Sequence, residues 1–129
     1  MGQPAAKKND QILATDTHLL VMPNGAVVPT PMPFTGVINN KLSTDVNIMG
    51  FAAAFVGSTA DNTPKHIVPP PATFQTPPTN TGTIRFGSLS VKINGKQAAR
   101  NNDKAETCND PAPLLAGTII ATGTVFIGN

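Results

Sequence analysis

Three side chains in this sequence are good ligands for a soft or borderline metal ion: His18, His66 and Cys108. Zinc binds imidazole nitrogen and thiolate sulfur, and a structural zinc site normally has four ligands in a tetrahedron. A fourth ligand would come from Asp16, another carboxylate, a water molecule or a neighbouring chain. The spacing alone is weak evidence, because the sequence contains no CxxC or HxxxH pair. Two surface histidines and one buried thiol are the alternative interpretation.

The sequence patterns of common enzymes are absent. It contains no GxSxG, GxxxxGK[ST] or GxGxxG motif, and its 7 carboxylates are scattered through turn-like contexts. A nucleophilic pair of Cys108 and His66 remains as a hydrolase hypothesis, but nothing in the sequence indicates an oxyanion hole. We therefore expect a protein that is not an enzyme.

The composition predicts one small domain without long helices. The chain has 129 residues, and its 13 Pro and 11 Gly disfavour long helices. Tyr and Trp are absent, which counts against a carbohydrate-binding module. The net charge is +2 and the cations are dispersed without interleaved aromatic residues, so we expect no nucleic-acid partner.

The first ten residues, MGQPAAKKND, have no apolar segment after their cations. This predicts that no secretory signal is cleaved and that the protein is cytoplasmic on synthesis. The longest mainly apolar stretch, IMGFAAAFVG at 48–57, is about half the roughly 20 residues that span a bilayer. We expect it to be buried or packed against a partner.

Two segments near the carboxyl end predict strands joined by tight turns. Residues 81–100 alternate apolar and polar side chains before Asn94-Gly95, a dipeptide typical of two-residue hairpins. Residues 116–129 repeat this design, with VFIGN at 125–129 matching VKING at 91–95.

The two ends of the chain also share a repeat. GQPAAKKND begins at Gly2 and GKQAARNND begins at Gly95. The chain stops at VFIGN, where another copy of the second stretch would begin, so we expect the termini to meet and complete one more unit. Short repeated β-units can wind about a common axis and cover one another's apolar faces. Two similar surface turns are the alternative interpretation.

The middle of the chain differs in character. Residues 23–61 are proline-rich, which favours extended edges and ordered loops, and we interpret them as an insertion. Within them, residues 40–57 are a candidate short helix. Ser43 or Thr44 could cap its start and Gly57 could end it.

The repeated stretches resemble the proline-alanine-alanine-arginine motif of PAAR-repeat proteins. These proteins are the pointed tips of contractile injection systems, such as type VI secretion systems, extracellular injection particles and phage-tail-like particles. GSLSVKINGKQAARNNDKAETC and AGTIIATGTVFIGN are similar to successive strand and turn segments of that family. Lys7 and Gln97 depart from the motif at its Arg and Pro positions.

The resemblance implies an all-β cone of short strands and hairpins with pseudo-threefold symmetry. It also implies a zinc ion at the apex, held by His18, His66 and Cys108, and it raises the expectation of such a site above what the spacing gives. A small cone has little core near its point, and a structural metal would supply stability there.

The function implied by the resemblance is structural. The protein would cap and sharpen a trimeric β-helical spike, of the valine-glycine-repeat or phage-hub type, with one tip per trimer, for piercing a target cell envelope. Separate effector chains are further expected partners, and contact with the target membrane would be transient. After assembly at the tip of the particle, the protein would become extracellular or enter the target cell.

Phe86, Phe126 and Ile127 are candidates for core or base contacts, and core is the preferred interpretation. Two alternative functions remain beside the spike tip. One is a metal-free β-rich adaptor, and the other, less favoured, is a small zinc or thiol hydrolase.

Overall fold

The computed structural model describes residues 2–128, and within that range the chain forms strands and no helix. The all-β prediction is confirmed. The strands are β1 (Gln3–Pro4), β2 (Gln11–Val21), β3 (Val27–Asn40), β4 (Asn47–Ile48), β5 (Phe51–Ala52), β6 (Thr59–Asn62), β7 (Thr73–Phe74), β8 (Thr81–Ile84), β9 (Lys92–Ile93), β10 (Lys96–Gln97), β11 (Lys104–Thr107), β12 (Leu114–Ile120) and β13 (Phe126–Ile127).

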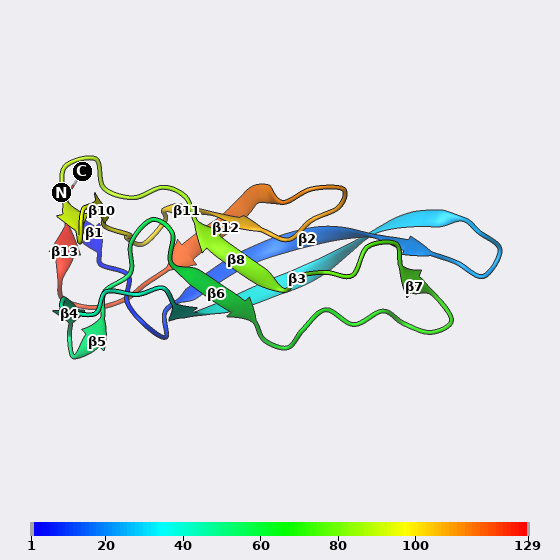
Figure 1. Cartoon of the computed structure of the whole chain (residues 1–129), viewed down its shortest axis with the longest axis horizontal. Helices are drawn as coiled ribbons and strands as arrows, with labels where there is room; N and C mark the ends of the chain where they lie inside the picture. Colours follow the sequence, from blue (N-terminus) through cyan, green and yellow to red (C-terminus); the bar gives the residue numbers. More distant parts are fainter. Residues whose placement is uncertain (1, 129) are drawn as a thin grey trace.

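A closed six-stranded sheet forms the centre of the molecule (Figure 1). Its strands follow the order β12-β11-β8-β6-β3-β2, and β2 pairs back with β12 through Leu13 and Thr118. Side chains alternate between the inside and the outside of a strand, so every second residue of β2 faces the interior. The largest apolar side chains buried inside the sheet are Ile12, Phe34, Ile38, Ile84 and Ile119.

Three short hairpins form the broad end of the molecule, which we call the base. They are the hairpins β4–β5 and β9–β10 and the antiparallel pair β13–β1, which has no connecting turn but which we count with the hairpins (Figure 1). The first two turn through Met49-Gly50 and Asn94-Gly95, with positive φ at all four residues. In the third, Gln3 pairs with Ile127, which confirms that the two ends of the chain complete one more unit.

Hydrogen bonds link the three hairpins in a ring about a pseudo-threefold axis. The Ala6 amide donates to the Ala99 carbonyl at 2.9 Å, Ala99 to Ala54 at 3.1 Å, and Ala54 to Ala6 at 3.0 Å. All three alanines are fully buried. Only a small side chain fits where three backbones approach so closely, and this is the physical reason for the repeated Ala-Ala pair.

The helix predicted within residues 40–57 is wrong. This segment is the third copy of the repeat, and Gly50 lies in the hairpin turn between β4 and β5. The Ser43 hydroxyl does accept bonds from the backbone, from the Asp45 and Val46 amides, but these bonds close a turn before β4. Residues 23–61 supply β3, β4, β5 and most of β6, so they are built into the sheet and the base.

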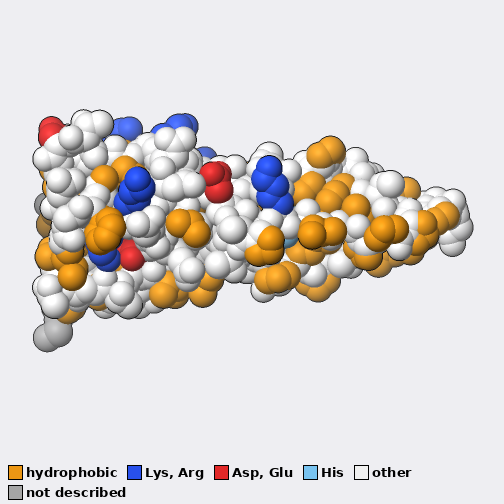
Figure 2. Space-filling view, turned by 90° about the horizontal axis from the view of Figure 1, so that it is seen from below, with side chains coloured by type: hydrophobic (Ala, Val, Ile, Leu, Met, Phe, Trp, Pro, Cys, Tyr) orange, Lys and Arg blue, Asp and Glu red, His pale blue; other side chains and the backbone are white. Residues whose placement is uncertain are grey.

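Beyond the closed sheet, β2 and β3 continue together as a long hairpin that narrows to a turn at residues 22–26 (Figures 1 and 2). We call the part beyond His18, together with β7, the extension. It has a small core of its own, in which Leu20, Met32 and Ala72 are buried and Phe74 packs against them. The molecule therefore tapers from the base to one point.

Strand and core predictions near the carboxyl end are correct in part. Ile127 is buried, but Phe86 and Phe126 are exposed, so assigning those two to the core was wrong. The alternation predicted over 81–100 is interrupted, because residues 85–91 lie between β8 and β9 and leave Leu89 exposed.

Candidate metal centre

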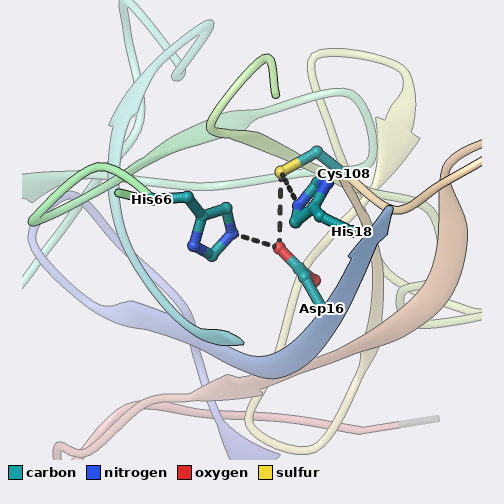
Figure 3. Close-up of side chains that lie close together, drawn as sticks. All are labelled: Asp16, His18, His66 and Cys108. Atoms are coloured by element: carbon teal, nitrogen blue, oxygen red, sulfur yellow. Dashed lines mark hydrogen bonds and ion pairs between the residues drawn. The ribbon is translucent and has the colours of Figure 1, made fainter. Parts of the chain in front are cut away.

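The three predicted ligands lie together, and Asp16 joins them (Figure 3). One donor atom from each of Asp16, His18, His66 and Cys108 lies within 4.8 Å of the others. Asp16, His18 and Cys108 are buried, and the His66 side chain is only 2% exposed. Residues from three distant parts of the sequence therefore converge on one point inside the molecule.

Strand geometry and two loops position these side chains. Asp16 and His18 are two residues apart on β2, so both point to the same face of the strand. Cys108 follows β11, and its neighbour Asn109 accepts a bond from the Thr17 amide at 2.8 Å. His66 lies between β6 and β7, where its amide donates to Asn80 Oδ1 at 2.8 Å.

Asp16 is the centre of the hydrogen-bond network. Its Oδ1 accepts from the Thr107 hydroxyl at 2.6 Å, and its Oδ2 lies 2.9 Å from His66 Nε2 and 3.3 Å from Cys108 Sγ. A fully buried carboxylate is costly unless it is paired and hydrogen-bonded. Here Oδ1 is held by neutral donors, while Oδ2 points toward the other three candidate ligands.

His18 presents its Nε2 to the cluster, 3.8 Å from Cys108 Sγ. Its Nδ1 lies 3.4 Å from Asp110 Oδ2 but makes no hydrogen bond within the described residues. The Leu19 amide fixes that carboxylate by donating to it at 2.8 Å. A carboxylate beside the second ring nitrogen is the arrangement that orients metal-binding histidines, so Asp110 is a candidate positioning residue.

His66 is held differently. The Asn62 amide group lies 3.3 Å from His66 Nδ1, and Asn62 Oδ1 is occupied by the Thr35 amide. This orientation makes Nδ1 an acceptor and places the ring proton on Nε2, facing Asp16. A metal at Nε2 would require the other tautomer, with the proton on Nδ1, and the contact between Asn62 Nδ2 and His66 Nδ1 would then not be a hydrogen bond.

Burial and the nearby carboxylate raise the pKa of the Cys108 thiol to about 11, in that order of importance. The charge of Asp16 and its hydrogen bond with the thiol both favour the protonated form. At neutral pH the metal-free thiol is therefore protonated, and a metal ion would have to displace its proton.

The donor set fits a borderline metal. Two imidazole nitrogens, one sulfur and one carboxylate oxygen are four ligands of the kinds that zinc takes. In a tetrahedral zinc site such atoms lie about 3.3–3.8 Å apart, given the usual bond lengths. When a metal binds, the 2.9 Å separation between Asp16 Oδ2 and His66 Nε2 would therefore widen slightly, and separations of up to 4.8 Å would shorten. Oxygen-preferring cations such as Mg²⁺ fit less well, because three of the four donors are nitrogen or sulfur.

The cluster does not lie at the point of the cone, where the sequence analysis expected it. β2 continues three residues past His18 to Val21, still paired with β3, before the turn at the tip. The four side chains lie where the closed sheet gives way to the extension, a region that we call the neck.

Sequence reasoning named Asp16 only as one option and missed Asp110 and Asn62. The position of Asp16, two residues before His18 in a strand-like segment, is a signal that could have selected it. The third repeat was missed as well, although IMGFAA at 48–53 matches INGKQA at 93–98 in its Ile, Gly and final Ala.

No protein-family model matches this chain, and no curated protein matches it. The site and the fold are therefore interpreted from their own geometry.

Proposed function

We propose that this protein is the tip of a trimeric spike in a contractile injection system. The single observation that carries the proposal is the ring of hydrogen bonds among Ala6, Ala54 and Ala99, which gives one chain a threefold base. A single chain with this symmetry can meet three identical partner chains in nearly equivalent ways. The taper away from the base supports the same role (Figure 1).

The symmetry extends to the outer part of the base. Ile48, Ile93 and Ile127 occupy equivalent positions in the three hairpins and are each 7% exposed. Short β-hairpins leave unpaired backbone groups, which can continue the strands of a β-helical partner. The hairpins would thus extend the spike and cover its open end.

In this proposal Asp16, His18, His66 and Cys108 hold a zinc ion that stiffens the neck. When bound, the ion supplies cross-links among β2, the segment between β6 and β7, and the segment after β11. Zinc binding contributes on the order of 10 kcal/mol in small zinc-dependent folds at neutral pH. A thin neck has little core, so this contribution would be large there.

A structural role is favoured over a hydrolytic one by the space beside the cluster. Two cavities reach the cluster: one lined by His18, Cys108 and Pro77 has a volume of about 130 Å³, and one lined by His66 and Asn62 has a volume of about 220 Å³. Pockets that bind small molecules are commonly 300–1,000 Å³. The four donors also form a closed set, whereas catalytic zinc keeps a position for water or substrate.

Two measurements test the proposal. Metal analysis of the purified protein should find about one zinc per chain, and mixing with a candidate trimeric spike should give one copy per three spike chains. If the purified protein contains no metal and its melting temperature does not change when zinc is added, the β-rich adaptor is favoured. Binding of three copies per trimer would contradict the threefold base.

A further inference from the structure

We infer that Asn80 positions two of the four candidate ligands, His66 and Cys108, and that Thr79 assists it at the sulfur atom. Neither residue belongs to the cluster of candidate ligands. Both lie in the segment between β7 and β8, directly before Thr81, where β8 begins. The inference rests on the proposed metal site and adds to it two residues that act on the metal only through its ligands.

The backbone of Asn80 has a conformation that few residues adopt. Its φ is 57°, in the left-handed region that asparagine enters more readily than most other residues with a side chain. The Asn80 carbonyl accepts from the Asn62 amide at 2.8 Å, and Asn80 Nδ2 donates to the Pro78 carbonyl at 3.3 Å. These bonds fix both the main chain and the side chain of Asn80.

The side-chain oxygen of Asn80 holds the segment that carries His66. Asn80 Oδ1 accepts from the His66 backbone amide at 2.8 Å and from Asn62 Nδ2 at 3.1 Å, so both of its lone pairs are used. The first of these bonds fixes the point at which the His66 side chain leaves the backbone. Asn80 thus restrains a ligand that lies between β6 and β7, outside the strands.

The sulfur of Cys108 contacts the same segment. Burial and the Asp16 carboxylate raise the pKa of the Cys108 thiol to about 11, whereas hydrogen bonds from the Asn80 backbone and the Thr79 side chain act in the opposite direction. The groups there that can donate to sulfur are the Asn80 amide and the Thr79 hydroxyl. Such bonds favour the thiolate, which is the form that binds a metal. Asn80 and Thr79 therefore offset part of the cost of charging a buried sulfur atom.

His66 and Cys108 are the two candidate ligands that no strand holds. Asp16 and His18 are fixed by β2, but Cys108 follows the end of β11 and His66 lies in a loop. A ligand in a loop has more conformational freedom to lose when a metal binds. Residues that restrain metal ligands in advance commonly change metal affinity 10- to 100-fold. Because Asn80 contacts both loop ligands, it is placed to align them with the pair on β2.

Cobalt titration of the full-length protein tests the inference. Co²⁺ accepts the same kinds of ligand as zinc, and a bound thiolate gives it a sulfur-to-metal charge-transfer band. Asn80→Gly keeps the backbone amide and tolerates positive φ, but it removes the side chain that holds His66. We expect about tenfold weaker Co²⁺ binding, with one ion per chain at saturation and the charge-transfer band at the wavelength of the parent.

Asn9→Gly is the matched control for this variant. Asn9 also has a positive φ, of 78°, but it is exposed and lies outside the cluster. Its replacement should leave Co²⁺ affinity unchanged. The melting temperature of each variant shows that it is folded.

Thr79→Val tests the contact with sulfur separately, because it replaces the hydroxyl with a methyl group of similar size. Loss of the donor raises the energy of the sulfur lone pairs, so we expect the charge-transfer band to move to longer wavelength. Thr79→Ser retains the hydroxyl and should keep the band where the parent has it. A residue that only supported the fold would not move this band in one variant and restore it in the other.

Two results would overturn the inference. One is Co²⁺ binding by Asn80→Gly that is as tight as in the parent, and the other is an identical band in Thr79→Val and Thr79→Ser. The second result stands even if Asn80→Gly does not fold. Failure of the proposed function looks different, since the parent protein itself would then take up neither zinc nor Co²⁺. Metal uptake by the parent with no difference among the variants contradicts this inference alone.

Discussion

At the scale of single residues, Asp16 links two of the other candidate ligands, because its Oδ2 lies within hydrogen-bonding distance of His66 and Cys108. It is fully buried, and the Thr107 hydroxyl fixes one of its oxygens while the other faces the remaining donors. Metal binding would still require loss of the Cys108 thiol proton and small movements of the donor atoms. The donors that hold Asp16 are thus as much a part of the site as the ligands themselves.

Replacing Asp16 by Asn should lower zinc affinity at least about 100-fold, because it removes an anionic ligand and leaves an amide in its place. Competition with a chromogenic chelator measures the change. Asp61→Asn is the matched control, since Asp61 is exposed and lies outside the cluster. Equal affinity in the two variants would remove Asp16 from the ligand set.

Asp110→Asn should reduce zinc affinity about tenfold without removing a ligand, because loss of the carboxylate leaves His18 Nδ1 less firmly oriented. The same chelator competition reports the loss. The expected signature of a positioning role is one zinc per chain at saturation with weaker binding. A stoichiometry that falls to zero would instead indicate that Asp110 is needed for the site to form.

Zinc affinity should increase with pH above neutrality. The pKa of Cys108 is raised to about 11, so the thiol is protonated in the metal-free protein and its proton leaves when zinc binds. One displaced proton gives about a tenfold rise in the apparent binding constant per pH unit. Affinity measured between about pH 7.5 and 9 checks this slope. Cys108→Ser should weaken zinc binding and reduce the dependence of zinc affinity on pH.

At the scale of elements, the base is one structural unit used three times. Equivalent hairpins contribute Ala6, Ala54 and Ala99 to one ring of hydrogen bonds. Each hairpin leads into a turn that is closed in the same way, as Asp10, Ser58 and Asp103 accept the backbone amide three residues earlier. In the second unit Gly57 and Ser58 stand where the others have Asn and Asp, so the geometry is kept while the side chains differ.

Enlarging any of the three ring alanines should be equally destabilising. Val at residue 6, 54 or 99 adds volume where three backbones meet, and overpacking of this kind costs about 1–3 kcal/mol. Thermal or denaturant unfolding measures the loss. Ala112→Val, at an exposed position, is the control. Markedly unequal losses would show that the three positions are equivalent in backbone geometry but not in their contribution to stability.

A circular permutant opened between Asn94 and Gly95, with the original ends joined by a short linker, should fold with nearly the same melting temperature. The hairpin β13–β1 is already paired across the original ends, so the permutant only moves the open turn from one equivalent hairpin to another. Opening the chain within β2, between Ala14 and Thr15, is the contrasting variant. That break lies in the most extensively paired strand and should prevent folding.

At the scale of the whole molecule, the fold consists of a symmetric base, a closed sheet and an asymmetric extension. The four candidate ligands lie at the boundary between the last two. Within residues 2–128, no helix has the length and hydropathy needed to span a membrane.

Removing zinc with a chelator should loosen one end of the molecule. Hydrogen exchange should rise in the outer half of β2, in β7 and in residues 62–80, because the neck then loses the link among its three segments. The base hairpins should keep their protection, since their ring of hydrogen bonds is remote from the cluster. Uniform loss of protection would indicate that the metal stabilises the entire fold.

The sequence determined the elements whose signals are local. Asn94-Gly95 specified a hairpin because its residues accept positive φ, and the matching ends of the chain specified that β1 and β13 would pair. His18, His66 and Cys108 were identifiable because few other side chains here bind a soft metal. Each of these inferences needs only residue type and short-range spacing.

Tertiary structure decided what depends on packing between distant segments. Residues 40–57 have features of a helix, but pairing and the threefold ring require a hairpin there. The choice of Asp16 depends on which strand face meets the segments that carry Cys108 and His66. The cluster lies at the neck because β2 and β3 stay paired beyond it. How far that pairing continues depends on which segments pack together, and no residue in the sequence marks where it ends.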